Sequence, residues 1–74
     1  MSAPRPIARA VDSSVIAAVA YSRRATLDLT FRHGARYRYF TVPAAVVEGL
    51  LAAPSKGTYF NRHIRAHFRF QRLA

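Results

Sequence analysis

The chain has 74 residues, and 51% of them are hydrophobic. A folded chain of this size buries only about 60% of the surface that is accessible in its unfolded state, so its length allows one domain at most. It has no cysteine, which excludes disulfides and thiolate metal sites as stabilising elements. Twelve Lys and Arg residues against three acidic ones give a net charge of +9, which predicts an anionic partner.

The N-terminal part divides into a lead-in and a first strand. Residues 1–11, which contain Pro4 and Pro6, are predicted to be a flexible lead-in, and residues 12–74 to form a single domain. Residues 15–21 are rich in β-branched side chains and too short for a helix, so we predict a strand there. No apolar run approaches the roughly 18 residues of a membrane span, so we expect no membrane association. The apolar stretch over residues 15–20 is too short for a signal peptide, so we expect a cytoplasmic protein.

The central part predicts a β-hairpin. Residues 26–32 alternate polar and apolar side chains without interruption, which indicates a half-buried strand. His33 and Gly34 then form a turn into a third strand over residues 35–42. The length of the turn decides which side chains share a face of the sheet.

The hairpin can form in two registers, which differ in the length of the loop. A two-residue loop would set Leu29 beside Arg38 and expose Tyr37 and Tyr39 as a stacking platform. A three-residue loop, with Gly34 in a left-handed position, sets Leu29 opposite Tyr37 and Asp28 opposite Arg38. We predict the three-residue loop, because it keeps one face apolar and pairs opposite charges on the other.

This register also predicts a basic surface, which we call the sheet strip. It consists of three arginines on the solvent-facing side of the hairpin: Arg32, Arg36 and Arg38. Guanidinium groups bind phosphates bidentately, and arginine interleaved with aromatic rings is typical of surfaces that follow a nucleic-acid backbone. The other explanation is ordinary strand alternation with solvated arginines.

The C-terminal half predicts two short helices. Pro43 stands where a first helical residue would, and apolar residues follow at helical spacing as far as Pro54. Ser55 is the expected N-cap of a second helix, in which Phe60, Ile64 and Phe68 make an apolar stripe. Residues 68–73 alternate again and predict either a short C-terminal strand or an extended tail. The expected fold is therefore α+β, a three-stranded antiparallel β-meander followed by two short helices packed on its apolar face.

The start of the second helix is a candidate phosphate site. Ser55, Lys56 and Gly57 place free backbone N–H groups, the helix dipole and a lysine together. The alternative is an ordinary helix cap with a solvated lysine. Asn61, Arg62 and Arg65 would extend such a site along the helix, and we call Lys56, Arg62 and Arg65 the helix flank.

No catalytic or metal-binding pattern is evident. The three carboxylates are isolated in the sequence and there is no cysteine. The sequence therefore shows no group of side chains suited to general acid–base or covalent catalysis. His63 and His67 are four residues apart, but Ile64 replaces the glutamate of a zinc protease and there is no third ligand. We expect neither an enzyme nor a bound metal or cofactor.

Two segments resemble a known family. The tyrosine pair in residues 37–40 is followed by Val42 and Pro43, and the run SKGTYFNRHIR occupies residues 55–65. Together they resemble the KTSC domain, which occurs at the C-terminus of some lysyl-tRNA synthetases and as stand-alone bacterial and phage proteins. The resemblance covers about residues 11–73 and implies a possible connection with RNA. The positions that it marks are Tyr37, Tyr39, Ser55, Lys56, Gly57, Asn61 and Ile64.

The sequence thus predicts a non-enzymatic nucleic-acid-binding module, with RNA or single strands favoured over duplex DNA. The predicted binding residues are Arg32, Arg36, Arg38, Tyr37, Tyr39, Ser55, Lys56, Gly57, Tyr59, Asn61, Arg62 and Arg65. Two alternatives stay open: a protein-interaction domain that docks on an acidic partner or pairs through an edge strand, and a module that binds a small anion. The sequence does not decide whether the sheet strip and the helix flank face the same way.

Overall fold

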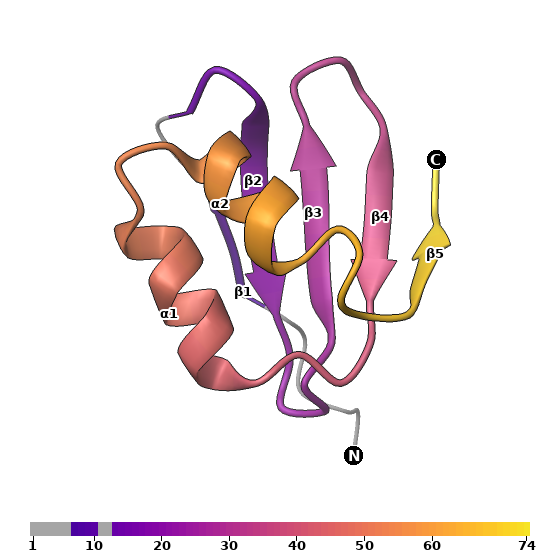
Figure 1. Cartoon of the computed structure of the whole chain (residues 1–74). Coiled ribbons are helices and arrows are strands. Elements are labelled where there is room, and N and C mark those ends of the chain that lie inside the picture. Colours follow the sequence, from indigo (N-terminus) through magenta and orange to yellow (C-terminus); the bar gives the residue numbers. More distant parts are fainter. Residues whose placement is uncertain (1–6, 11–12) are drawn as a thin grey trace.

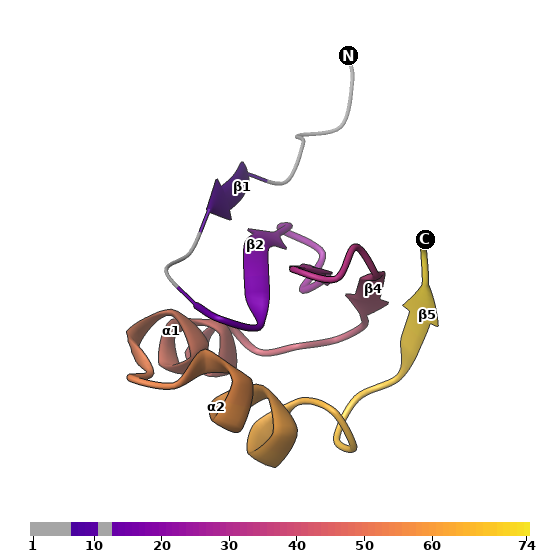
Figure 2. The same cartoon turned by 90° about the horizontal axis from the view of Figure 1, so that it is seen from above.

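A computed structural model describes residues 7–10 and 13–74 of the chain as one antiparallel sheet with two helices on one of its faces (Figures 1 and 2). The elements are β1 (Ile7–Ala10), β2 (Ile16–Tyr21), β3 (Leu27–Phe31), β4 (Arg36–Tyr39), α1 (Ala44–Ala52), α2 (Lys56–His63) and β5 (Phe70–Arg72). The strands lie side by side in sequence order. We call the face beneath the helices the inner face and the opposite one the outer face.

The predicted fold class is confirmed. Strands β2, β3 and β4 form the meander, α1 and α2 follow it, and residues 70–72 form a short C-terminal strand on the edge of β4. The structure adds an edge strand that the sequence analysis did not predict, since β1 pairs with β2 and places Arg9 opposite Val19. The rest of the predicted lead-in, residues 1–6 and 11, lies outside the described residues.

The predicted hairpin register is also confirmed. Leu29 lies opposite Tyr37 and Asp28 lies opposite Arg38. The Phe31 N–H donates to the Ala35 carbonyl at 2.9 Å and closes a three-residue loop. Gly34 has φ = 101° in this loop, a conformation that glycine adopts without steric cost.

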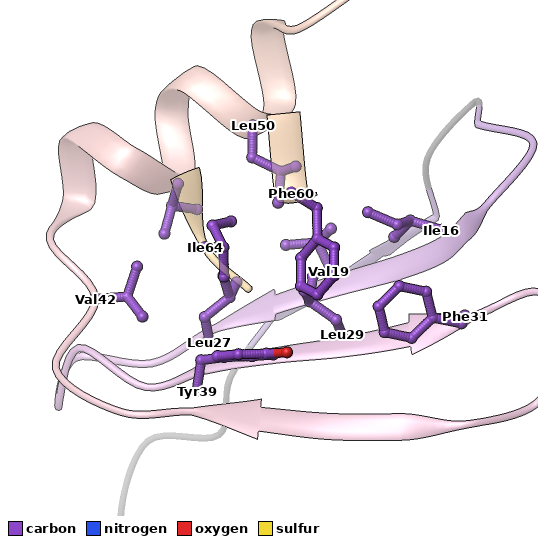
Figure 3. Packing of buried hydrophobic residues seen from close by; sticks show 11 residues of the cluster. Ile16, Val19, Leu27, Leu29, Phe31, Tyr39, Val42, Leu50, Phe60 and Ile64 are labelled. Carbon is purple, nitrogen blue, oxygen red and sulfur yellow. The ribbon is translucent and has the colours of Figure 1, made fainter. Parts of the chain in front are cut away.

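The core lies between the inner face of the sheet and the two helices (Figure 3). Strands contribute side chains such as Leu27 and Leu29, while α1 contributes Leu50 and α2 contributes Phe60. The fully or nearly fully buried cluster comprises Ile16, Val19, Leu27, Leu29, Phe31, Tyr39, Val42, Val47, Leu50, Phe60 and Ile64. Alternation along the strands therefore selects the residues that the helices cover.

The helix boundaries differ in detail from the prediction. Pro43 is the extended N-cap of α1 rather than its first helical residue. Helix α2 ends at His63, because the N–H groups of Ile64 and Arg65 both donate to the Phe60 carbonyl and terminate the helical pattern. Phe68 consequently does not extend the helical stripe but packs against the core from the segment that leads to β5.

Candidate functional site

The sheet strip lies on the outer face, but much of its charge has a partner. The Arg38 guanidinium donates from Nε to Asp28 Oδ1 at 2.8 Å and from Nη2 to Oδ2 at 2.9 Å. These two bonds and the negative charge of Asp28 raise the pKa of Arg38 above its ordinary value. Arg32 donates from Nε to the Ser13 carbonyl. Arg36 is exposed and forms no ion pair with a described residue.

The residues of the predicted phosphate site, at the start of α2, make contacts within the protein. Ser55 caps the helix, with its Oγ accepting from the Thr58 N–H at 3.4 Å. Lys56 donates from Nζ to the Ala53 carbonyl, at the C-terminus of α1, at 3.1 Å. A Cβ at Gly57 would lie 3.1 Å from a methyl carbon of Val15, so glycine permits close packing of α2 against the chain before β2. These contacts favour the capping explanation, and anion binding here stays a prediction.

Tyr59 packs between the helices instead of forming an exposed platform. Its hydroxyl donates to the Val46 carbonyl at 2.9 Å, and the ring is half-buried against the core. Gly49 makes room for it, because a Cβ at that position would lie 2.2 Å from Tyr59 Oη. Tyr59 therefore fixes α2 against α1.

The other predicted binding residues of α2 and of the turn that follows it are exposed. Asn61, Arg62 and Arg65 all have solvent-accessible side chains. Helix α2 lies on the inner side of the sheet (Figure 2). Arg36 and Arg38 alternate with the inner-face residues Tyr37 and Tyr39, so they lie on the outer face. The sheet strip and the helix flank thus face opposite ways, which answers the question that the sequence left open.

A hollow of about 360 Å³, which we call the aromatic cleft, lies where β3, β4 and β5 meet the end of α2. It is lined by six aromatic or imidazole side chains and one arginine, which are Phe31, His33, Tyr37, Tyr39, Phe60, Phe70 and Arg65. Of the tyrosines predicted for binding, Tyr39 is only 3% exposed and Tyr37 is half-buried. Both reach this cleft from the inner face.

The phenylalanines of the cleft were missed by the sequence analysis as site residues. Phe31 and Phe60 carry the pattern of core residues, which they also are. Phe70 belongs to the segment predicted as a strand or a tail, and only its pairing opposite Tyr39 brings it to the cleft. The alternation of polar and apolar residues over 68–73 indicated a strand, but it could not show that this strand pairs with β4.

Five rings of the cleft contact one another in a closed circuit. Phe31 meets Phe60, Phe60 meets Tyr39, Tyr39 meets Phe70, Phe70 meets Tyr37, and Tyr37 returns to Phe31, with centroids 5.2–5.9 Å apart. Four of the five contacts are edge-to-face. His33 stacks on Phe31 at 5.7 Å.

Two arginines adjoin the aromatic cleft. Arg65 lines it, and the Arg72 guanidinium carbon lies 5.7 Å from the centre of the Tyr37 ring. Burial raises the pKa of Tyr39, as does the neighbouring Tyr37, while Arg65 partly opposes this shift. None of the lining residues is acidic.

The histidines of α2 and its end have other contacts. The His63 ring lies 4.5 Å from the ring of Tyr59, and His67 Nε2 lies 2.9 Å from the Arg62 carbonyl oxygen. Within residues 7–10 and 13–74, no group of three or more His, Cys, Asp or Glu side chains could hold a metal ion. The same residues include no helix long and apolar enough to cross a bilayer.

The fold matches a solved structure over nearly its whole length. A KTSC domain protein from Yersinia pestis superposes with a TM-score of 0.87 and 28% identity, covering 93% of this chain and 99% of that one. A family model for the KTSC domain matches residues 12–68. The chain therefore belongs to the KTSC domain family.

Relatives of the chain include a large enzyme and a small protein. It is 42% identical over 64 residues to a lysine–tRNA ligase of Nostoc punctiforme, of whose length it spans 11%. It is also 38% identical over 66 residues to an uncharacterized protein of Stutzerimonas stutzeri, covering 86% of this chain and 93% of that one. The similar sequence is thus a small part of the ligase and almost all of the second protein.

Proposed function

We propose that this chain is a non-enzymatic nucleic-acid-binding module of the cytoplasm, which binds RNA or single strands mainly through their phosphates. The observation that carries the proposal is a set of exposed arginines between the end of α2 and β5. This set, which we call the arginine segment, consists of Arg62, Arg65 and Arg72. It leaves out Arg69, whose guanidinium lies over Phe40 on the outer face. Residues 62–72 include no acidic residue.

No arginine of the arginine segment forms an ion pair with a described residue, although Arg72 donates from Nε to the Ala74 carbonyl at 3.2 Å. Asp28 pairs with Arg38 on the outer face, and it makes the one ion pair among the described residues. Glu48 lies on α1. Guanidinium groups bind phosphates in a bidentate geometry, so the arginine segment suits a nucleic-acid backbone.

The relatives support RNA as the class of nucleic acid. The Nostoc punctiforme relative is named a lysine–tRNA ligase, so one relative that contains a similar sequence acts on a tRNA. A module of this size within such an enzyme would add contacts to the RNA outside the catalytic part. In a separate small protein, the same surface would act alone.

The salt dependence of binding tests this proposal. If each of the three arginines neutralises one phosphate, the plot of log affinity against log salt should have a slope of roughly −2.1 for a single strand, at about −0.7 per phosphate. Fluorescence anisotropy with tRNA, single-stranded RNA and duplex DNA across a salt series measures it. We expect tighter binding of the RNAs, whereas a flat salt response would contradict the proposal.

The free edge of β5 favours a second candidate, pairing with another copy of the chain. β5 is the last strand of the sheet, and all three of its residues are exposed. The Leu73 N–H donates to Arg36 in β4, so the Arg72 N–H points to the free edge. Light scattering should then find a dimer that Arg72→Pro abolishes, and a monomer at all concentrations would exclude this candidate.

A further inference from the structure

We propose that the aromatic cleft binds a single unstacked nucleobase and that Arg65 binds the phosphate next to it. This inference rests on the proposed function and names the part of the nucleic acid that the cleft recognises. The cleft differs from the predicted binding surfaces because three of its aromatic side chains, Phe31, Phe60 and Phe70, come from separate elements and were not expected to meet.

The ring geometry suits a flat aromatic ligand. The five rings contact one another mostly edge-to-face, an arrangement that covers less of each ring face than stacking does. Phe70 is 56% exposed, so one wall of the cleft is an aromatic ring open to solvent. Single-stranded nucleic acids are commonly held by stacking of bases on such rings.

The tyrosine hydroxyls provide a second, independent observation. The Tyr21 hydroxyl donates to the Val42 carbonyl at 2.6 Å, and the Tyr59 hydroxyl donates to Val46. In contrast, neither Tyr37 nor Tyr39 forms a side-chain hydrogen bond with another described residue. The two hydroxyls without an internal partner are those of the cleft, where they can pair with the polar edge of a base.

Size and charge restrict the ligand further. A volume of 360 Å³ lies near the lower end of the range of about 300–1,000 Å³ that is typical of small-molecule pockets, so it suits one base and not a duplex. Arg65 at the cleft and Arg72 beside Tyr37 favour a ligand that carries an anionic group next to its aromatic one. A nucleotide within an RNA strand has both groups, whereas an aromatic protein side chain would leave the guanidinium groups without a partner.

The test compares two short oligonucleotides of equal length and equal phosphate number, one of oligouridine and one with abasic ribose at every position. We expect the wild-type chain to bind oligouridine about tenfold more tightly in fluorescence anisotropy, which is the size of effect that one stacked base supplies. Equal affinities would overturn the cleft inference and leave phosphate binding standing. Binding of neither oligonucleotide would overturn both the inference and the proposed function.

Two phenylalanines make a matched pair for locating the effect. Phe70→Ala removes an exposed wall of the cleft, and Phe40→Ala removes a phenylalanine outside the cleft that lies beneath the Arg69 guanidinium. We expect Phe70→Ala to abolish the preference for oligouridine and Phe40→Ala to preserve it, with folding monitored by circular dichroism. Phe70→Leu, which retains apolar cover but no ring, should also lose the preference. An unchanged preference in both Phe70 variants would overturn the inference.

Discussion

Replacing Gly49 by alanine should destabilise the protein by about 1–2 kcal/mol, although alanine favours helices. The new Cβ would lie 2.2 Å from Tyr59 Oη and 2.8 Å from Cζ, well inside contact distance. Moving the ring costs about 1–3 kcal/mol of packing and endangers the hydrogen bond to Val46, worth about 0.5–1.5 kcal/mol. The helix propensity of alanine returns only about 1 kcal/mol, so the steric effect prevails.

A double-mutant cycle with Tyr59→Leu separates these two effects. Leucine lacks the atoms that the Gly49 Cβ would meet, so in that background Gly49→Ala should stabilise the protein by up to about 1 kcal/mol. Urea unfolding followed by circular dichroism gives the free energy of unfolding of all four proteins. If Gly49→Ala had the same effect in both backgrounds, the assigned contact between α1 and α2 would be wrong.

Three further substitutions test other contacts. Ser55→Ala removes the cap of α2 and should cost about 1 kcal/mol in urea unfolding while leaving RNA affinity unchanged; a marked loss of RNA affinity would instead support the phosphate site. Asp28→Asn removes a partly exposed ion pair with Arg38 and should cost about 0.2–1 kcal/mol, with a smaller loss in high salt; a loss that is independent of salt would argue against an electrostatic origin. Tyr39 has a raised pKa in the folded state, so above about pH 10 the unfolded state loses its proton first and stability falls as pH rises. Tyr39→Phe should make this decline shallower in urea unfolding between pH 9 and 11, and an identical decline would contradict the raised pKa of Tyr39.

The hairpin could be predicted because its determinants are local. Alternation in residues 26–32 identifies the apolar face, and Gly34 can adopt the left-handed conformation that a three-residue loop needs. The charge pair between Asp28 and Arg38 follows from the same register. The cap at Ser55 is equally local, because it bonds to the N–H three residues later.

The aromatic cleft could not be predicted in this way, because it depends on contacts between distant segments. Phe60 reaches it from α2, and Phe70 reaches it only because β5 pairs with β4. Strand β1 was missed for a similar reason, since it gains its hydrogen bonds from the far edge of β2. Nor does the sequence reveal that Lys56 bonds to the Ala53 carbonyl, which makes its charge less available than its position suggests.

The central claim is that nucleic acid binds on the side of the aromatic cleft and not on the outer face of the sheet. Arg65→Glu and Arg36→Glu test it as a matched pair, because each reverses one exposed arginine without an ion pair to a described residue. Anisotropy with single-stranded RNA across a salt series should show weaker binding for Arg65→Glu and a slope shallower by about 0.7. Arg36→Glu should leave the slope as in the wild type. Loss of binding in Arg36→Glu with normal binding in Arg65→Glu would contradict the account.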